Sequence, residues 1–254
     1  HVLVSRFLSD AGQQALAYGA LVAVMRRGGS AFDAALLGVA ALVPAALLGL
    51  YGGAVADALP KRVALAAVYN LQALLCFVVP IFIGTDLPAM VLLLFAVNAL
   101  GQVSGPSESA VLPLIASREQ LATAASLVNL ASSAGTAFGT ALLAPIVVRL
   151  FGVTAMLYLS GGLLLLAATR VFDLPTQEER RTPMPLRVSP ARLRSALTWL
   201  THEPAVGTMI IVAALAGTAN VVIQTLAPRY VQSALHVDPA EAVYVFGPPR
   251  SPAY

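Results

Sequence analysis

The residues with the most informative spacing lie in a short gap between two long apolar runs: Gly53, Asp57, Lys61 and Arg62. A small residue stands four positions before the acid, and two adjacent cations follow the acid by four and five positions. This spacing suits a tight helix-loop-helix turn at a membrane surface. A partly dehydrated carboxylate there can bind an opposing cation or helix N-terminus and later release it. The alternative is that the cations only set membrane orientation and that Asp57 caps the following helix.

Asp10 is the acid that lies well inside an apolar run. An ionisable group at such depth costs roughly 3 kcal/mol and usually faces a cavity or a partner. Arg6 stands one helical turn earlier, so an i,i+4 ion pair is available. We expect Asp10 either to line a pathway for protons or substrate, with Gln13 and Gln14 extending its face, or to form a structural pair with Arg6.

Two pairs of amide side chains recur at helical spacing in other apolar runs: Asn98 with Gln102, and Asn220 with Gln224. Residues four apart share one face of a helix. Each pair is expected either to contact substrate in a central cavity or to form interhelical hydrogen bonds, worth about 0.6 kcal/mol on average.

Small and acidic residues near the middle of the chain also suggest roles. Gly135 and Gly139 lie four apart, a spacing that lets helices pack closely, and we expect a packing surface there. Glu108 is predicted to follow the end of an apolar helix near the cytoplasmic face, either solvated or paired with Arg118.

Several chemistries find no support in the sequence. It contains no Ser-His-Asp set, phosphate-binding loop or cluster with metal-ligand spacing, so we expect neither an enzyme nor a cofactor or metal. Its single cysteine, Cys76, cannot form an intramolecular disulfide. The net charge is +3, but the cations are dispersed at the edges of apolar runs, which argues against nucleic acid as a partner.

The composition points to a lipid bilayer as the solvent of the chain. It is 58% hydrophobic and 11% charged, whereas an average soluble domain carries about 25% charged residues. A spanning helix needs about 20 mainly apolar residues. The sequence predicts spans over residues 3–25, 34–56, 63–84, 88–107, 121–148, 153–172 and 205–226.

These spans divide the chain into three predicted parts. Residues 1–172 form a six-helix transmembrane bundle, residues 173–203 a basic cytoplasmic linker with an interfacial helix, and residues 204–254 the start of a second bundle with a shortened eighth helix. Both ends look cut, so we expect a truncated chain. More Lys and Arg border the side of the N-terminus, which predicts a cytoplasmic N-terminus. The excess of Arg over Lys and the many alanines are typical of a GC-rich bacterial genome.

This plan of six helices, a long basic linker and a second bundle resembles the major facilitator superfamily. That family's loop between helices 2 and 3 reads Gly-x-x-x-Asp-x-x-Gly-Arg/Lys-Arg/Lys, and Gly53, Asp57, Lys61 and Arg62 match it in register. Pro60 stands where the motif has its second glycine.

Two further stretches resemble one branch of the family. Residues 105–121 are similar to the helix 4–5 connection of bacterial exporters like the enterobactin exporter, sometimes labelled transmembrane secretion effectors, and residues 5–12 fit the same branch. Asn98 stands nearest to the family's proton-coupling arginine of helix 4. Thr140 follows Gly139 where the antiporter pattern of helix 5 has a Gly-Pro step.

The resemblance implies an all-α membrane protein of the bacterial inner membrane that transports a small molecule across the bilayer. It would export an amphipathic or drug-like substrate by alternating access, without a cofactor, and protons are the expected coupling ion. Gly53, Asp57, Lys61 and Arg62 would form a conformational gate that contacts helix 11 of the second bundle. The alternatives are an importer or lipid flippase of the same fold, or a non-transporting membrane or scaffold protein.

Overall fold

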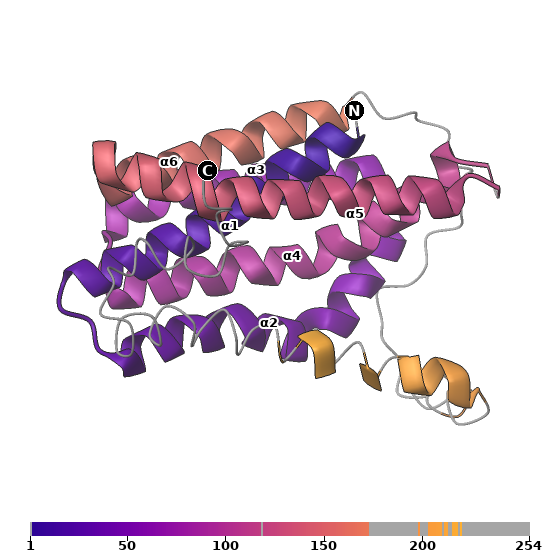
Figure 1. Cartoon of the computed structure of the whole chain (residues 1–254), viewed down its shortest axis with the longest axis horizontal. Helices are drawn as coiled ribbons and strands as arrows, with labels where there is room; N and C mark the ends of the chain where they lie inside the picture. The colour runs from indigo at the N-terminus through magenta and orange to yellow at the C-terminus, as the bar shows by residue number, and fades with distance from the viewer. Residues whose placement is uncertain are drawn as a thin grey trace, which may run out of the picture. The chain divides into compact units, whose positions relative to one another are not determined.

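The chain is described by a computed structural model that places residues 2–117, 119–172, 198, 203–209, 211–212, 215–217 and 219. It divides into two compact units, His1–Val188 and Ser189–Tyr254, and each is considered by itself. The described residues of the first unit form a bundle of long helices that run side by side (Figure 1).

The helices follow one another with short turns. They are α1 (Val2–Arg26), α2 (Ala31–Ala58), α3 (Lys61–Val78), α4 (Leu87–Ile115), α5 (Leu121–Ala137) and α6 (Ala144–Val171). The π turn η1 (Val79–Ile83) extends α3, and η2 (Phe138–Leu143) joins α5 to α6. Gly152 has φ +84° inside α6, a conformation that an L side chain rarely adopts, and it breaks the run into two spans. The predicted spans 121–148 and 153–172 meet at this glycine.

The core of the bundle lies between α1, α3, α4 and α6. α1 packs mainly on α6 and α5, α2 lies along α4, and α3 contacts both α6 and α4. Large side chains on these helices are fully buried, among them Leu16, Tyr69, Met90, Leu93 and Leu164. Helices far apart in the sequence therefore share one apolar interior.

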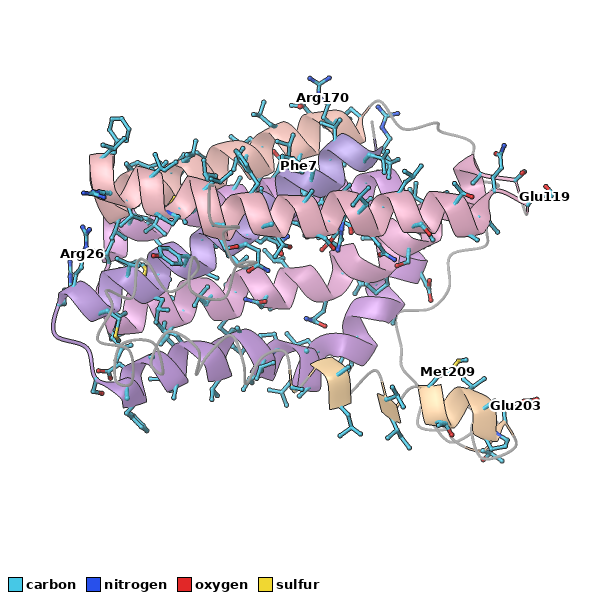
Figure 2. The ribbon with its side chains drawn as sticks, in the orientation of Figure 1. Phe7, Arg26, Glu119, Arg170, Glu203 and Met209 are labelled. Atoms are coloured by element: carbon cyan, nitrogen blue, oxygen red, sulfur yellow. The ribbon has the colours of Figure 1, made fainter. Side chains whose placement is uncertain are left out.

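The outer faces of the helices are also apolar. Phe82 is 78% exposed and Phe151 72% exposed, and apolar side chains project outward along the bundle (Figure 2). An aqueous surface rarely carries so many large apolar side chains in contact with solvent. By length and composition, the helical stretches that can cross a membrane are Ala31–Gly49, Lys61–Ile83, Leu87–Pro113 and Leu121–Val171. The predicted all-α membrane fold is confirmed, and the described residues contain no strand.

α1 is the most polar of these helices. It has 25 residues, enough to cross a bilayer, but Arg6, Asp10, Gln13 and Gln14 lower its apolar character. Such residues are tolerated in a spanning helix where they face the interior of a bundle. α1 accordingly packs against α5 and α6 on one side and also contacts α2 and α4.

α4 is longer than the sequence predicted and contains two prolines. The helix continues through Pro106 and Pro113 to Ile115, eight residues beyond the expected end at residue 107. Helix-breaking residues persist in membrane helices because neighbouring helices and hydroxyl side chains satisfy the freed backbone groups. Ser107 and Ser109 donate to the carbonyls of Val103 and Gly105, one turn earlier. The carbonyls that lose their N–H partner to the two prolines are those of Gln102 and Ser109.

Glycines set the closest helix contacts. A Cβ atom on Gly135 would lie 2.5 Å from the carbonyl oxygen of Phe7, and one on Gly139 would lie 2.5 Å from that of Ala11. On the other side of the bundle, a Cβ atom on Gly52 would lie 2.4 Å from the carbonyl oxygen of Gln102. α5 therefore touches the backbone of α1, and α2 touches that of α4.

The described part of the second unit is short. Residues 204–209 are helical, and Thr208 donates to the carbonyl oxygen of Pro204 over 2.9 Å. Most of the predicted linker over residues 173–203 lies outside the described residues, as does most of the predicted span 205–226, with Asn220 and Gln224.

Neighbouring glycines of α2 provide a matched test of the α2–α4 contact. Gly52→Ala should destabilise the protein by about 1–3 kcal/mol, because the new methyl group meets the backbone of α4. Gly53→Ala should have a much smaller effect, since no atom lies within 4 Å of its Cβ position. Thermal unfolding of the purified variants in detergent measures both, and equal midpoints would contradict the packing described.

Candidate functional site

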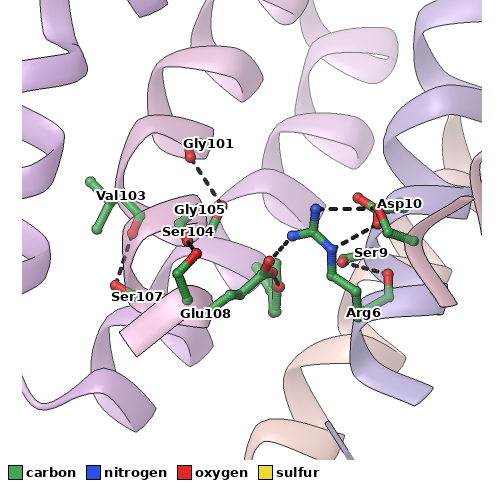
Figure 3. Close-up of polar contacts among 12 residues, drawn as sticks. Arg6, Ser9, Asp10, Gly101, Val103, Ser104, Gly105, Ser107 and Glu108 are labelled. Carbon is green, nitrogen blue, oxygen red and sulfur yellow. Dashed lines mark hydrogen bonds and ion pairs between the residues drawn. The ribbon is translucent and has the colours of Figure 1, made fainter. Parts of the chain in front are cut away.

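A cluster of charged side chains lies inside the bundle, near the start of α1. The Arg6 guanidinium stands between two carboxyl groups, that of Asp10 on the same helix and that of Glu108 on α4 (Figure 3). Arg6 Nε lies 2.9 Å from Asp10 Oδ2, and Arg6 Nη1 contacts Glu108 Oε2. The three side chains are 28%, 15% and 13% exposed. The guanidinium of Arg6 therefore forms ion pairs with two largely buried carboxyl groups.

Hydroxyl groups from two further helices complete the cluster. Tyr69 of α3 is buried and donates its hydroxyl proton to Glu108 Oε1. Arg6 Nη2 donates to Ser132 Oγ of α5 over 3.4 Å. Four helices of the bundle, α1, α3, α4 and α5, thus meet in one polar network.

The backbone around the cluster is anchored by buried serines of α1. Ser9 donates to the carbonyl oxygen of Arg6, and Ser5 donates to that of Ala167 on α6 over 3.1 Å. The bond from Ser5 joins α1 to α6 and helps to fix the rotation of α1, whereas the bond from Ser9 lies within α1. The sequence offered an ion pair of Asp10 with Arg6, and the structure adds Glu108 of α4 to it.

A small cavity adjoins the charged cluster. Its volume for a water-sized probe is about 20 Å³, enough for roughly one water molecule. Arg6, Tyr69 and Glu108 supply its polar lining, and apolar side chains of α3 to α6 supply most of the rest: Leu65, Val111, Leu112, Val128 and Val171. The cavity is therefore too small for an organic substrate of ordinary size.

Glu108 is a correction to the sequence interpretation. The sequence predicted a solvated acid at the end of a helix, or a pair with Arg118, which lies outside the described residues. Instead Glu108 lies within α4 and contacts Arg6 and Tyr69. The predicted span ended at residue 107, one residue before Glu108, whereas α4 continues to Ile115. An acid between two helix-tolerated prolines was the signal that could have placed it inside the bundle.

The second site is the turn between α2 and α3. α2 ends at Ala58, α3 begins at Lys61, and Leu59 and Pro60 form the whole connection. Lys61 Nζ lies 3.7 Å from Asp57 Oδ1 and also donates to the carbonyl oxygen of Ala56. The Asp57 side chain is 64% exposed, whereas that of Lys61 is 12% exposed. The acid therefore projects from the turn and the lysine folds back onto it.

Asp57 does not cap α3, which was the alternative reading of this motif. The N-cap residue is Pro60, and no side chain makes a capping hydrogen bond there. By contrast, Ser30 and Asp33 form a reciprocal capping box at the start of α2. The carboxylate of Asp57 is thus not committed to the helix N-terminus that follows it.

The remaining members of the motif have different surroundings. The Arg62 guanidinium stacks over the ring of Phe172 at the end of α6, 5.3 Å from the ring centre. Gly53 has open space at its Cβ position, and its neighbour Gly52 makes the backbone contact with α4. The close contact between α2 and α4 is therefore made at Gly52, one residue before Gly53, the glycine that matches the family motif.

The amide side chains predicted to contact substrate are partly buried. Asn98 donates to the carbonyl oxygen of Leu94, and Gln102 to that of Asn98, each one turn earlier on α4. The donor groups are thus used within the helix, not in the interhelical bonds given as the alternative. Gln13 and Gln14 are half-buried on α1.

These two sites differ in what they can do chemically. The buried cluster holds two carboxyl groups, which can accept or release a proton, and one of them, Glu108, lines the small cavity. The exposed carboxylate at the α2–α3 turn can bind and release an external cation or helix N-terminus.

Removal of the shared cation tests the buried cluster. Arg6→Gln should destabilise the protein by about 3 kcal/mol, the lower end of the range for broken buried pairs because Arg6 is 28% exposed. Arg26→Gln is the matched control, since this arginine is exposed at the other end of α1. Thermal unfolding in detergent gives the comparison, and an Arg6 variant as stable as the Arg26 variant would show that the cluster is energetically neutral.

Comparison with known proteins agrees with this geometry. No curated protein matches the chain. The family model of the Major Facilitator Superfamily matches residues 2–250, almost the whole chain and both of its units. The match agrees with the six helical spans and with the motif between α2 and α3, and it supports a multi-pass membrane protein with a small-molecule substrate. The chain belongs to the major facilitator superfamily.

Proposed function

We propose that the protein is a secondary active transporter that exports a small amphipathic or drug-like molecule from the bacterial cytoplasm. It moves the substrate by alternating access of a site between two helical bundles. The N-terminus lies in the cytoplasm, as the distribution of Lys and Arg favours. This places the α2–α3 turn at the cytoplasmic surface of the inner membrane.

The observation that carries the proposal is the geometry of the α2–α3 turn. Asp57 projects from the turn with most of its side chain exposed, and its pair with Lys61 is long at 3.7 Å. A carboxylate held in this way can bind the second bundle in one conformation and release it in another. Lys61 and Arg62 keep the turn rigid, because one binds the end of α2 and the other stacks on Phe172.

The remaining polar residues fit a transport pathway on the same bundle. We place Asp10, Gln13 and Gln14 of α1 and Asn98 and Gln102 of α4 along it, with Asn220 and Gln224 as partners from the second bundle. Gly135 and Gly139 allow α5 to slide against α1, since backbone contacts without side chains resist rotation least. Protons are the coupling ion that we propose, and Asp10 is on their path.

Loss of the exposed carboxylate tests the gate. Asp57→Asn should slow efflux of an amphipathic dye about tenfold, because a charge-dipole contact of about 1–2 kcal/mol shifts a two-state equilibrium by that factor. Efflux is measured from cells expressing the protein at matched membrane levels.

Asp86→Asn is the matched control for the gate. Asp86 is an exposed acid at the turn before α4, where its side chain makes no capping hydrogen bond. It should leave dye efflux unchanged. Equal efflux by wild type and Asp57→Asn would contradict the gating role proposed for Asp57. Faster loss of labelled lipid than of dye would favour a lipid flippase.

Proton coupling makes a separate prediction at α1. Asp10→Asn should abolish the pH dependence of dye efflux, because the variant lacks the carboxyl group that carries the proton. Initial efflux rates at several external pH values, with the membrane potential collapsed, measure this. A pH dependence equal to that of wild type would remove Asp10 from the coupling pathway.

A further inference from the structure

The charged cluster in the bundle is unbalanced. Arg6 supplies one positive charge, and Asp10 and Glu108 supply two carboxyl groups that both contact its guanidinium. With both acids ionised, the cluster would carry a net charge of −1 within the membrane-spanning part of the bundle.

The described side chains of the helices around the cluster add hydroxyl and apolar groups to it. α3 contributes the neutral hydroxyl of Tyr69, and α5 contributes that of Ser132. α6 contributes the apolar side chain of Val171 to the adjoining cavity. The cation that the described structure pairs with both carboxyl groups is therefore Arg6.

A net charge in this place is costly. An ion removed from water loses several kcal/mol of solvation even after relaxation of its surroundings, and the two carboxylates also repel each other through the one guanidinium. Two acids that share a site lose their protons as a coupled pair, so one proton stays after the other has left. Addition of one proton to a carboxylate oxygen leaves one carboxylate, one carboxylic acid and the guanidinium, with no net charge.

We propose that Arg6, Asp10 and Glu108 form a binding site for one exchangeable proton, shared between the two acids. A metal cation does not suit the site, because the guanidinium already lies between the carboxyl groups and would repel it. Arg6 and Glu108 border the adjoining cavity of about 20 Å³, so we expect the proton to enter and leave the cluster on the Glu108 side.

The position of the proton affects how the helices are joined. When Glu108 is ionised, it accepts from Arg6 of α1 and from Tyr69 of α3 and ties both helices to α4. When Glu108 carries the proton, Arg6 pairs with Asp10 on its own helix and the tie between α1 and α4 weakens. Proton uptake is thereby linked to a movement of α1 relative to α4.

This site deepens the proposed transport function, because it names two acids and one arginine as the place where the coupling proton binds. The role of the proton site in transport rests on that proposed function. The binding of a proton at the site does not depend on it, and can be measured on the purified protein without any substrate.

Infrared spectroscopy measures the proton directly. The wild-type protein in lipid nanodiscs at neutral pH should show a carboxylic acid C=O band equivalent to one group per chain, shifted in D₂O. Both Glu108→Gln and Asp10→Asn should lose the whole band, since either change leaves one acid balanced by Arg6. Circular dichroism verifies that each variant is folded.

Glu119→Gln is the matched control for this measurement. Glu119 is exposed in the α4–α5 turn, and hydrogen bonds from its own backbone N–H and from Ser117 hold the pKa of its carboxyl below the usual value. It is ionised at neutral pH, so the band should remain in this variant.

The alternatives give different spectra. A band that persists in Glu108→Gln, or in Asp10→Asn, would show that one acid holds the proton through its own burial, and would overturn the shared site. Absence of the band from the wild type would overturn it without any variant. If the band is present but dye efflux is absent from cells, the proton site stands and the transport function fails.

Discussion

Direct contact between helix backbones is the constraint on which this bundle depends. Lipid tails are as apolar as the side chains that face them, so the hydrophobic effect does not drive helices together in a bilayer, and close packing must do so. Gly135 and Gly139 bring α5 onto the backbone of α1, and Gly52 brings α2 onto that of α4. These contacts position the two helices that carry the acids of the buried cluster.

The charged cluster could not exist without this close packing. Arg6, Asp10 and Glu108 come from two helices, and Tyr69 and Ser132 add hydroxyl groups from two more. Such a network is stable in a bilayer only where neighbouring helices exclude lipid from it. The same packing leaves a cavity of about 20 Å³ beside Glu108, which is too small for an organic substrate.

Much of the fold could be predicted from the sequence because spanning helices are long, apolar and continuous. The first four predicted spans correspond to α1 to α4, and the last two cover the run from α5 through α6, which is interrupted at Gly152. α4 runs eight residues past the predicted end at residue 107, and both Pro106 and Pro113 are accommodated within it. The π turns η1 and η2 left no recognisable pattern, since they depend on backbone bonds and not on side-chain periodicity.

The sequence by itself determined the fold class, the order of the spans and the family motif at Asp57, Lys61 and Arg62. These are local properties, set by apolar length and by spacing along one chain. Only the tertiary structure decided that Glu108 belongs with Arg6 and Asp10, and that Gly52 makes the backbone contact beside the motif. Helices that are distant in the sequence meet at both places, and the rotation of each about its axis is fixed by packing that no spacing within a single helix reveals.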